Sequence, residues 1–149
     1  MDGNFGLELP AKWQLLWRGQ AQYASQPLIS GEQLSAGGRT WLRGAGSVFG
    51  DRGFLSAVDL YSPEIAPGLR GLFFFDVATV GNNNATLARP SSDALSSAGL
   101  GLRYNHASGW YLVADYAQVL KGSVIALTTN TAAPQRGNSS VYLTVGARF

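Results

Sequence analysis

The sequence of 149 residues has no cysteine and little charge, and each shortage narrows what the protein could be. Without cysteine, a disulfide framework, a thiolate zinc site and a thiol nucleophile are all excluded. Charged residues make up 13% of the chain, about half the share found in an average globular domain. Such a chain keeps few charges for a soluble surface, and its polarity comes instead from Asn, Gln, Ser and Thr.

Long apolar runs and basic clusters are also missing. Asp76 interrupts the longest apolar run, so no segment reaches the roughly 20 residues of a membrane-spanning helix. The net charge is only +2, with arginines scattered singly, and we therefore expect no nucleic-acid partner. The first ten residues, MDGNFGLELP, lack the basic and apolar regions of a signal peptide. That start is typical either of a cytoplasmic protein or of the later part of a longer one.

What the sequence does contain is alternation of apolar and polar residues, while helical spacing never persists beyond one turn. This pattern predicts an all-β antiparallel fold. Six strands are expected, at residues 13–23, 54–61, 69–80, 98–104, 110–119 and 139–149. Their connections alternate between long and short, at residues 24–53, 62–68, 81–97, 107–109 and 120–138.

Strand length, low charge and alternating loops together favour a transmembrane β-barrel. Barrel strands have about 9 to 11 residues, with short turns on one side, long loops on the other and an apolar outer face. Aromatic residues fall near strand ends on the apolar faces, as interface girdles do: Trp13, Tyr23, Tyr104, Trp110, Tyr116 and Phe149. The alternative is a soluble β-sandwich or small barrel that binds a ligand, because its strands alternate as well.

Six strands are too few to close a membrane barrel. The smallest such barrels have about eight strands, and open strand edges are not tolerated in lipid. We therefore expect residues 1–149 to be a single incomplete domain, open as a fragment. Because the last strand ends in the aromatic residue Phe149, the missing strands are expected before Met1.

Two acidic residues, Asp59 and Asp76, lie on neighbouring predicted strands and face the same side. Two carboxylates close together repel each other unless a cation compensates them. Arg43, within the glycine-rich connection, is the candidate, because a guanidinium can bond two carboxylates through its planar fork. The alternative is that both acids face water and that Arg43 lies on a solvated loop.

Catalytic chemistry finds no support in the sequence. The one histidine, His106, lies at a predicted turn beside Asn105. No ordered Ser, His and Asp set, metal-ligand cluster, glycosidase acid pair or phosphate loop emerges. We expect no enzyme activity, no catalytic residue, no metal and no cofactor.

A series of short motifs runs through residues 25–60 and continues to the end of the chain. The first motifs are Gly31-Glu32-Gln33-Leu34, Gly37-Gly38, Leu42-Arg43-Gly44-Ala45, Gly50-Asp51-Arg52-Gly53 and Asp59-Leu60. FFDVA at 74–78 resembles a Phe-x-Asp-x-Gly strand motif, and residues 96–104 and 112–120 resemble a last hairpin. In this order the motifs resemble the two-partner secretion transporters, the haemolysin secretion/activation proteins of Gram-negative outer membranes.

The resemblance implies a sixteen-stranded barrel in which the glycine-rich loop joins strands eleven and twelve. This chain would then hold the last six strands. The implied function is secretion and activation of a large exoprotein of haemolysin or adhesin type across the outer membrane of a Gram-negative bacterium. The implied partners are the exoprotein, captured by periplasmic POTRA domains that are absent here, the outer-membrane lipid and the barrel-assembly machinery.

The resemblance also assigns roles to residues. It implies a lumenal loop motif of Leu42, Arg43 and Gly44, with Asp59 and Asp76 as its acidic partners. The loop scaffold would be Gly37, Gly38, Gly50, Asp51, Arg52 and Gly53, and Phe149 would be the assembly signal.

The chain departs from the family pattern at two positions. Ala45 stands where an aromatic residue is expected, and Ala78 stands where a glycine is expected. A barrel-assembly or insertase protein of the same superfamily remains an alternative, because it shares the Arg-Gly tetrad and the Phe-x-Asp motif.

Overall fold

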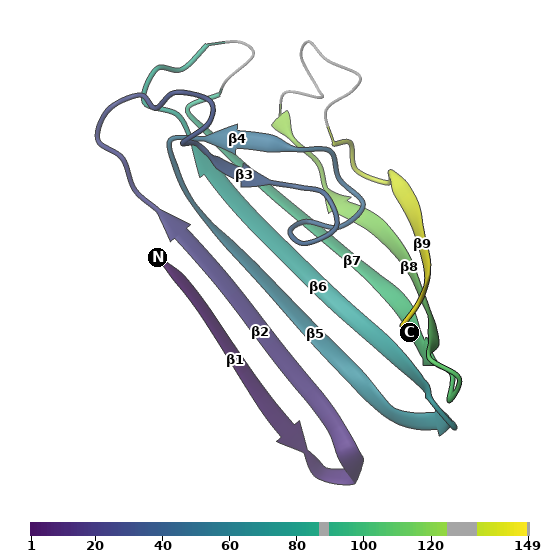
Figure 1. Cartoon of the computed structure of the whole chain (residues 1–149). Coiled ribbons are helices and arrows are strands. Elements are labelled where there is room, and N and C mark those ends of the chain that lie inside the picture. The colour runs from purple at the N-terminus through teal and green to yellow at the C-terminus, as the bar shows by residue number, and fades with distance from the viewer. Residues whose placement is uncertain (87–89, 125–133, 149) are drawn as a thin grey trace.

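One antiparallel sheet accounts for most of the computed structural model, which describes residues 1–86, 90–124 and 134–148. Its order is β1-β2-β5-β6-β7-β8-β9, so strands that follow one another in the sheet are hydrogen-bonded neighbours (Figure 1). Their bounds are β1 Asp2–Leu9, β2 Trp13–Gln22, β5 Arg52–Ala66, β6 Leu69–Gly81, β7 Ser92–Asn105, β8 Trp110–Lys121 and β9 Ser139–Ala147. The all-β antiparallel prediction is confirmed. Over the described residues the sheet is not closed, and β1 and β9 form its two edges.

The sheet has seven strands, one more than the six predicted. The additional strand is β1, which pairs with β2 from Asp2 opposite Gln20 to Leu9 opposite Trp13. The turn between them is the short 3-10 segment η1, Pro10–Lys12. Its residues Ala11 and Lys12 have positive φ values of 59° and 63°. Positive φ in turns is usually supplied by Gly, Asn or Asp, so Pro10 was the only residue of this segment that marked a turn.

The strands β5 and β7 also extend beyond their predicted bounds. β5 continues through Pro63, which was predicted to lie in a turn, and the pairing with β6 shifts register between Tyr61 and Glu64. Proline lacks the N–H that a regular ladder requires, and an irregularity of this kind accommodates it. The actual turn is formed at residues 67–68. β7 begins at Ser92 rather than at residue 98, which shortens the preceding connection to residues 82–91.

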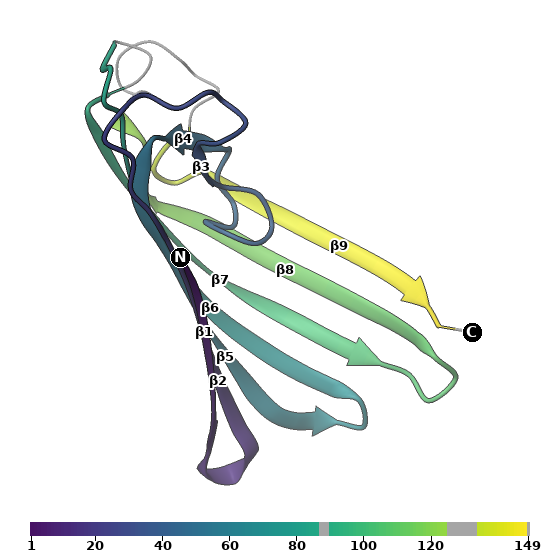
Figure 2. The ribbon, with the colours of Figure 1, turned by 60° about the vertical axis from the view of Figure 1, so that its left-hand side comes forward.

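Two short strands that were not predicted lie inside the long connection between β2 and β5. They are β3 Leu34–Ala36 and β4 Val48–Gly50, which pair antiparallel as a separate two-stranded sheet. We call residues 34–50 the inner hairpin. The main sheet is curved, and the inner hairpin lies on its concave side (Figures 1 and 2).

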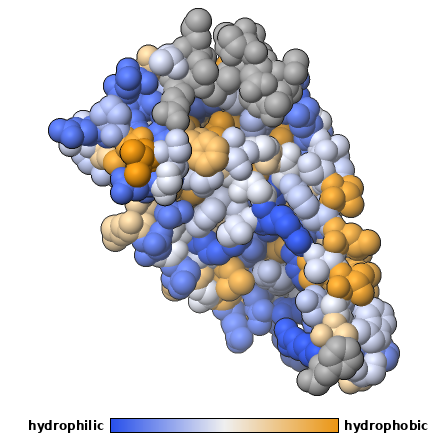
Figure 3. Space-filling view, turned by 45° about the horizontal axis from the view of Figure 1, so that its top comes forward, coloured by the Kyte–Doolittle hydropathy of each residue, from blue (hydrophilic) through white to orange (hydrophobic). Residues whose placement is uncertain are grey.

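The two faces of the main sheet differ in character. Hydrophilic residues dominate the side that carries the inner hairpin, while hydrophobic residues gather along one edge (Figure 3). Under the hairpin, apolar side chains from both layers form a buried core: Leu34, Ala36, Leu42, Ala45, Val48, Leu55, Ala78, Val80, Leu95 and Val119. The convex face instead exposes large apolar residues: Phe54, Phe73, Phe75, Leu100, Leu102 and Tyr116. No helix within the described ranges is long and apolar enough to cross a membrane.

Candidate functional site

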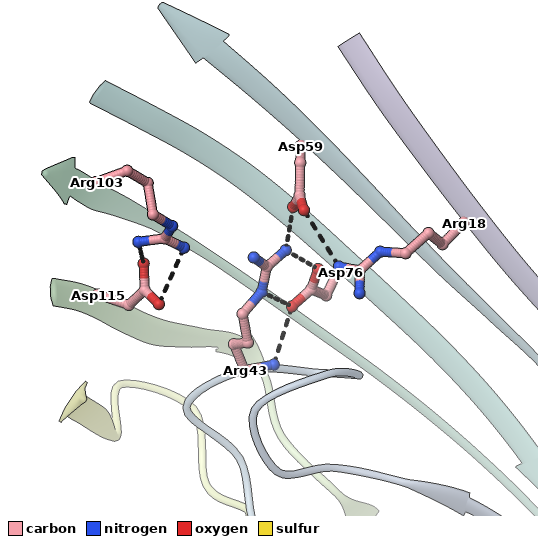
Figure 4. Close-up of polar contacts among 6 residues, drawn as sticks. All are labelled: Arg18, Arg43, Asp59, Asp76, Arg103 and Asp115. Atoms are coloured by element: carbon pink, nitrogen blue, oxygen red, sulfur yellow. Dashed lines mark hydrogen bonds and ion pairs between the residues drawn. The ribbon is translucent and has the colours of Figure 1, made fainter. Parts of the chain in front are cut away.

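The turn of the inner hairpin brings Arg43 against the main sheet. Leu42, the residue before it, is only 1% exposed and belongs to the core beneath the hairpin. Its backbone has a positive φ of 54°, a conformation that is strained for a residue with a side chain. Burial of the Leu42 side chain stabilises this conformation, and it leaves the Arg43 side chain on the sheet side of the turn (Figure 4).

Arg43 is bound to Asp76 through both its backbone and its side chain. The Arg43 backbone N–H donates to Asp76 Oδ2 at 2.9 Å, and Arg43 Nε donates to the same oxygen at 2.9 Å. Arg43 Nη2 donates to Asp76 Oδ1 at 2.8 Å. Because Asp76 is wholly buried in β6 and Arg43 is 4% exposed, water does not compete for these bonds.

A second carboxylate completes the site. Arg43 Nη2 also bonds Asp59 Oδ1 on β5, and Arg18 Nη2 on β2 lies 3.2 Å from Asp59 Oδ2 (Figure 4). Two arginines thus face two carboxylates, so the formal charges balance. We call Arg18, Arg43, Asp59 and Asp76 the Arg43 cluster.

An aromatic ring lies beneath the guanidinium of Arg43. The Arg43 Cζ atom is 3.7 Å from the centroid of the Phe74 ring, a cation–π contact that is strongest when water is excluded. Gly99, on β7 opposite Phe74, makes room for that ring. A Cβ atom at Gly99 would lie 2.3 Å from Phe74 Cζ and 2.0 Å from the Tyr116 carbonyl oxygen.

The tip of the hairpin reaches across to β8 and β9. Gly44 has a positive φ of 86°, and a Cβ atom there would lie 2.9 Å from the Cβ of Ala117, so glycine suits both the turn and the close approach. Its N–H donates to the Tyr142 hydroxyl at 3.3 Å, and its carbonyl accepts from Ser140 Oγ at 3.3 Å. Ala45, which stands in place of the expected aromatic residue, is buried beside this tip.

Two opposing effects act on the pKa of Arg43. Burial disfavours the charged guanidinium and lowers the pKa, while hydrogen bonds and attraction from Asp76, and then from Asp59, raise it. The net result is a pKa above the ordinary arginine value. The stability contributed by a group with a raised folded pKa is fully present below the unfolded pKa and is lost only as pH rises through the folded value. Arg43 therefore stays charged throughout the physiological range.

Asp51 holds the base of the long connection together. Its buried carboxylate accepts from the Leu28 N–H at 2.9 Å, from Gln33 Nε2 at 2.8 Å and from the Asn83 N–H at 2.8 Å. These donors come from two separate segments of the chain, residues 23–33 and residues 82–91. Arg52, the next residue, is exposed and contacts none of these segments by a hydrogen bond or ion pair among the described residues.

The other predicted scaffold positions are glycines, of which Gly37, Gly50 and Gly53 lie at crowded places. A Cβ atom at Gly50 would lie 2.9 Å from the Cβ of Val80, and one at Gly53 would lie 2.1 Å from the Thr79 carbonyl oxygen. Gly37 and Gly38 form the stem of the inner hairpin, where the Gly38 N–H donates to the Ala45 carbonyl. Phe149, the predicted assembly signal, lies outside the described residues.

Several residues of the site were not predicted to belong to it. The bond from Arg18 to Asp59 and the roles of Phe74, Gly99 and Tyr142 were not anticipated. A second ion pair, Arg103 with Asp115 at 2.6 Å, lies on the same face but apart from the Arg43 cluster (Figure 4).

The surroundings of His106 and the grouping of possible metal ligands bear on catalytic and metal chemistry. His106 stacks on Trp110 at 5.1 Å between ring centroids, and its Nδ1 lies 2.6 Å from Ser108 Oγ at the turn between β7 and β8. Within the part of the chain that the structure describes, no three His, Cys, Asp or Glu residues are grouped so as to hold a metal ion.

Comparison with known proteins gives one match. Residues 3–104, which run from β1 to β7 and include the whole Arg43 cluster, match the family described as haemolysin secretion/activation protein ShlB/FhaC/HecB. Neither a curated protein nor a solved structure matches the chain. The match covers well over half of the sequence and selects one of the families that the sequence motifs left open. This chain belongs to the haemolysin secretion/activation protein family ShlB/FhaC/HecB, a family of two-partner secretion transporters and not of enzymes.

Proposed function

We propose that residues 1–149 form the C-terminal part of an outer-membrane β-barrel that secretes and activates a large exoprotein of haemolysin or adhesin type. The observation that carries this proposal is the Arg43 cluster. A glycine-rich hairpin is bound against the concave face of a curved sheet by a buried arginine and two carboxylates. In a barrel that face would line the lumen, and the hairpin would lie across the path of a secreted polypeptide.

The convex face supports placement in a membrane. Leu100 on β7 is 61% exposed, and Phe73 and Phe75 on β6 are also exposed, although none of these strands is an edge of the sheet. In water, a contiguous apolar surface of this kind favours aggregation. In lipid it is the expected outer face of a barrel strand. The outer membrane of a Gram-negative bacterium is therefore the proposed location.

The two open edges support a larger barrel. Strand edges with unpaired N–H and C=O groups are not tolerated in lipid, and β1 and β9 each have a neighbour on one side only among the described residues. We infer that further strands complete the barrel. Because β1 precedes the strand that leads into the inner hairpin, the chain would hold the last seven of sixteen strands rather than the last six.

The unequal anchoring of the hairpin suggests how it responds to a substrate. Arg43 and its backbone are held by several short, charge-assisted bonds on β5 and β6. The tip is held on β9 by two neutral bonds of 3.3 Å at Gly44, one to Tyr142 and one to Ser140. Charge-assisted bonds contribute about 1.5 to 3 kcal/mol each and neutral ones about 0.5 to 1.5 kcal/mol. A polypeptide in the lumen would displace the tip first, while the Arg43 cluster keeps the hairpin on the wall.

The partners follow from the same proposal. POTRA domains elsewhere in the transporter would capture the exoprotein, and the barrel-assembly machinery would recognise Phe149 and insert the barrel. We propose no cofactor, because capture, insertion and transport involve binding and movement and do not make or break covalent bonds.

The experiment is secretion of the cognate exoprotein by the complete transporter carrying Arg43→Ala. We expect secretion to fall by at least about tenfold, because one charge-assisted bond is equivalent to about a factor of ten. Arg39→Ala is the matched control. It removes another arginine of the same hairpin, whose one hydrogen-bond partner among the described residues is the Thr144 hydroxyl and which lies over the Tyr142 ring.

Assembly of the barrel is measured in parallel by heat-modifiable migration in a gel. If Arg43→Ala fails to assemble, Arg43→Lys keeps the charge but loses the planar fork and is used in its place. Normal secretion by an assembled Arg43 variant would contradict the proposed role.

A further inference from the structure

Two cations at one end of the convex face play no part in the Arg43 cluster or in the core. They are Arg52, at the start of β5, and Lys121, at the end of β8. Both side chains are exposed, and neither forms an ion pair or a hydrogen bond within the described part of the chain. Arg43 and Arg103, in contrast, are both paired with aspartates.

The strand register places both cations on the convex face. Arg52 pairs opposite Gly81, one row beyond the exposed Phe54 on the same side of β5. The Arg52 side chain lies over Gly81, with Nε 3.1 Å from where a Cβ would stand. Lys121 pairs with Ser96, which alternation places on the same face as the exposed Leu100. The cations therefore stand at the end of the apolar band.

Arg52 and Lys121 line one hollow of about 600 Å³ between the ends of these strands. A hollow of this size can hold a small ligand group. Among the described residues that line it, Asp93 is the one acid, and Asp93 is buried. Its carboxylate accepts from the Ser123 hydroxyl and from the N–H groups of Ala94 and Val124. Two cations are thus left to face an incoming anion.

We propose that Arg52 and Lys121 bind the phosphate groups of outer-leaflet lipopolysaccharide in this hollow. The inference rests on the proposed membrane placement, in which the long connections mark the outer side of the membrane. Both cations lie at that end, at the level of the lipid headgroups. A guanidinium fork matches two phosphate oxygens, and an ammonium adds a point charge. The apolar band directly below the hollow would carry the acyl chains of the same molecule, which favours a lipid over free phosphate.

The test is binding of purified lipopolysaccharide to the complete transporter in an uncharged detergent. Wild type is compared with the double variant Arg52→Gln/Lys121→Gln, and we expect apparent affinity to fall about a hundredfold, roughly tenfold for each lost cation. Each single variant should lose about tenfold. Lys12→Gln is the matched control, because Lys12 is an exposed cation in the turn at the opposite end of the sheet. The affinity of this variant for lipopolysaccharide should equal that of wild type.

Two further probes identify the ligand chemistry. Lipopolysaccharide stripped of its phosphates should bind as weakly to wild type as the intact lipid does to the double variant. Inorganic phosphate alone should bind far more weakly than intact lipopolysaccharide, because it lacks acyl chains. Equal affinity of wild type and the double variant would overturn the proposal, and so would undiminished binding of the dephosphorylated lipid or equally tight binding of inorganic phosphate.

Failure of this inference can be told apart from failure of the proposed function. Heat-modifiable migration of wild type in detergent reports the barrel independently of any lipopolysaccharide. A wild-type protein that needs no detergent and shows no such migration would contradict the barrel itself. An assembled, secreting transporter whose lipopolysaccharide affinity is unchanged in the double variant would overturn only the phosphate site.

Discussion

The side chains on the two faces of β6 lie in opposite environments. Asp76, on the concave face, is wholly buried and is held by three bonds from one arginine. Its neighbour Phe75 points the other way and is 40% exposed. The stability contributed by a concave residue such as Asp76 therefore depends on its hydrogen-bond partners. The stability contributed by a convex residue such as Phe75 depends on whether water or lipid surrounds it. Substitutions on the two faces should differ accordingly, in size and in sensitivity to conditions.

The largest effect is expected from Asp76→Ala. The substitution leaves Asp59 as the one carboxylate that pairs with buried Arg43 in the described part of the chain, and breaking one side of a buried ion pair costs about 3 to 5 kcal/mol. The loss is measured by urea titration of the complete transporter in lipid vesicles. Asp115→Ala serves as the comparison, because its partner Arg103 is partly exposed and can turn to water. A loss below about 1 kcal/mol for Asp76→Ala, typical of a surface pair, would contradict the account.

A charge on the convex face should have the next largest effect. Leu100→Arg places a cation among lipid chains, which costs about 2 to 4 kcal/mol near the centre of the bilayer. Gln20→Arg places the same charge on the concave face, opposite Leu55, where the proposed lumen holds water. The control should stay within about 0.5 kcal/mol of wild type, as surface substitutions do. Equal losses in the same titration would remove the difference between the two faces.

Gly99→Ala tests the packing beneath Arg43. The added methyl group would press on the Phe74 ring and the Tyr116 carbonyl, and overpacking of this kind costs about 1 to 3 kcal/mol. Gly31→Ala is the control, because a Cβ atom there would meet nothing within 4 Å. Unfolding of both variants is compared by the same titration. Wild-type stability for Gly99→Ala would show that the Phe74 ring does not need this space.

The smallest effect is expected from Arg18→Gln. The Arg18 side chain is 32% exposed, and pairs of this kind contribute about 0.2 to 1 kcal/mol. Its contribution should shrink as salt concentration rises, since exposed charges are screened, while that of the buried Arg43 should not. Stability measured at low and high salt separates the two arginines. A salt-independent loss for Arg18→Gln would place it among the buried contacts.

Alternation and adjacency predicted only that Asp59 and Asp76 share a face, and the resemblance to the family supplied Arg43 as their expected partner. Asp59 and Asp76 lie on strands joined by a tight turn, and period-two alternation puts them on one face. The link from Arg18 to Asp59 could not be predicted in the same way. Arg18 pairs opposite Ala57, so the ion pair runs diagonally and depends on the exact register.

Other features depend on three-dimensional packing that a pattern does not contain. The strand β1 was missed because its turn uses Ala11 and Lys12 where Gly or Asn would be recognisable. The place of Phe74 under the guanidinium depends on the direction of a ring and on the space that Gly99 leaves for it. The hydrogen bond from Gly44 at the tip to Tyr142 joins residues 98 positions apart in the sequence. No local sequence pattern predicts a contact over that separation.

The most direct test of the central claim is a double-mutant cycle on Arg43 and Asp76. The complete transporter is titrated with urea as wild type, Arg43→Gln, Asp76→Asn and the double variant. If the pair holds the inner hairpin on the sheet, the double variant should lose less than the sum of the single losses, with a coupling of about 1.5 to 3 kcal/mol. Losses that add to within about 0.5 kcal/mol, as for independent sites, would contradict the claim.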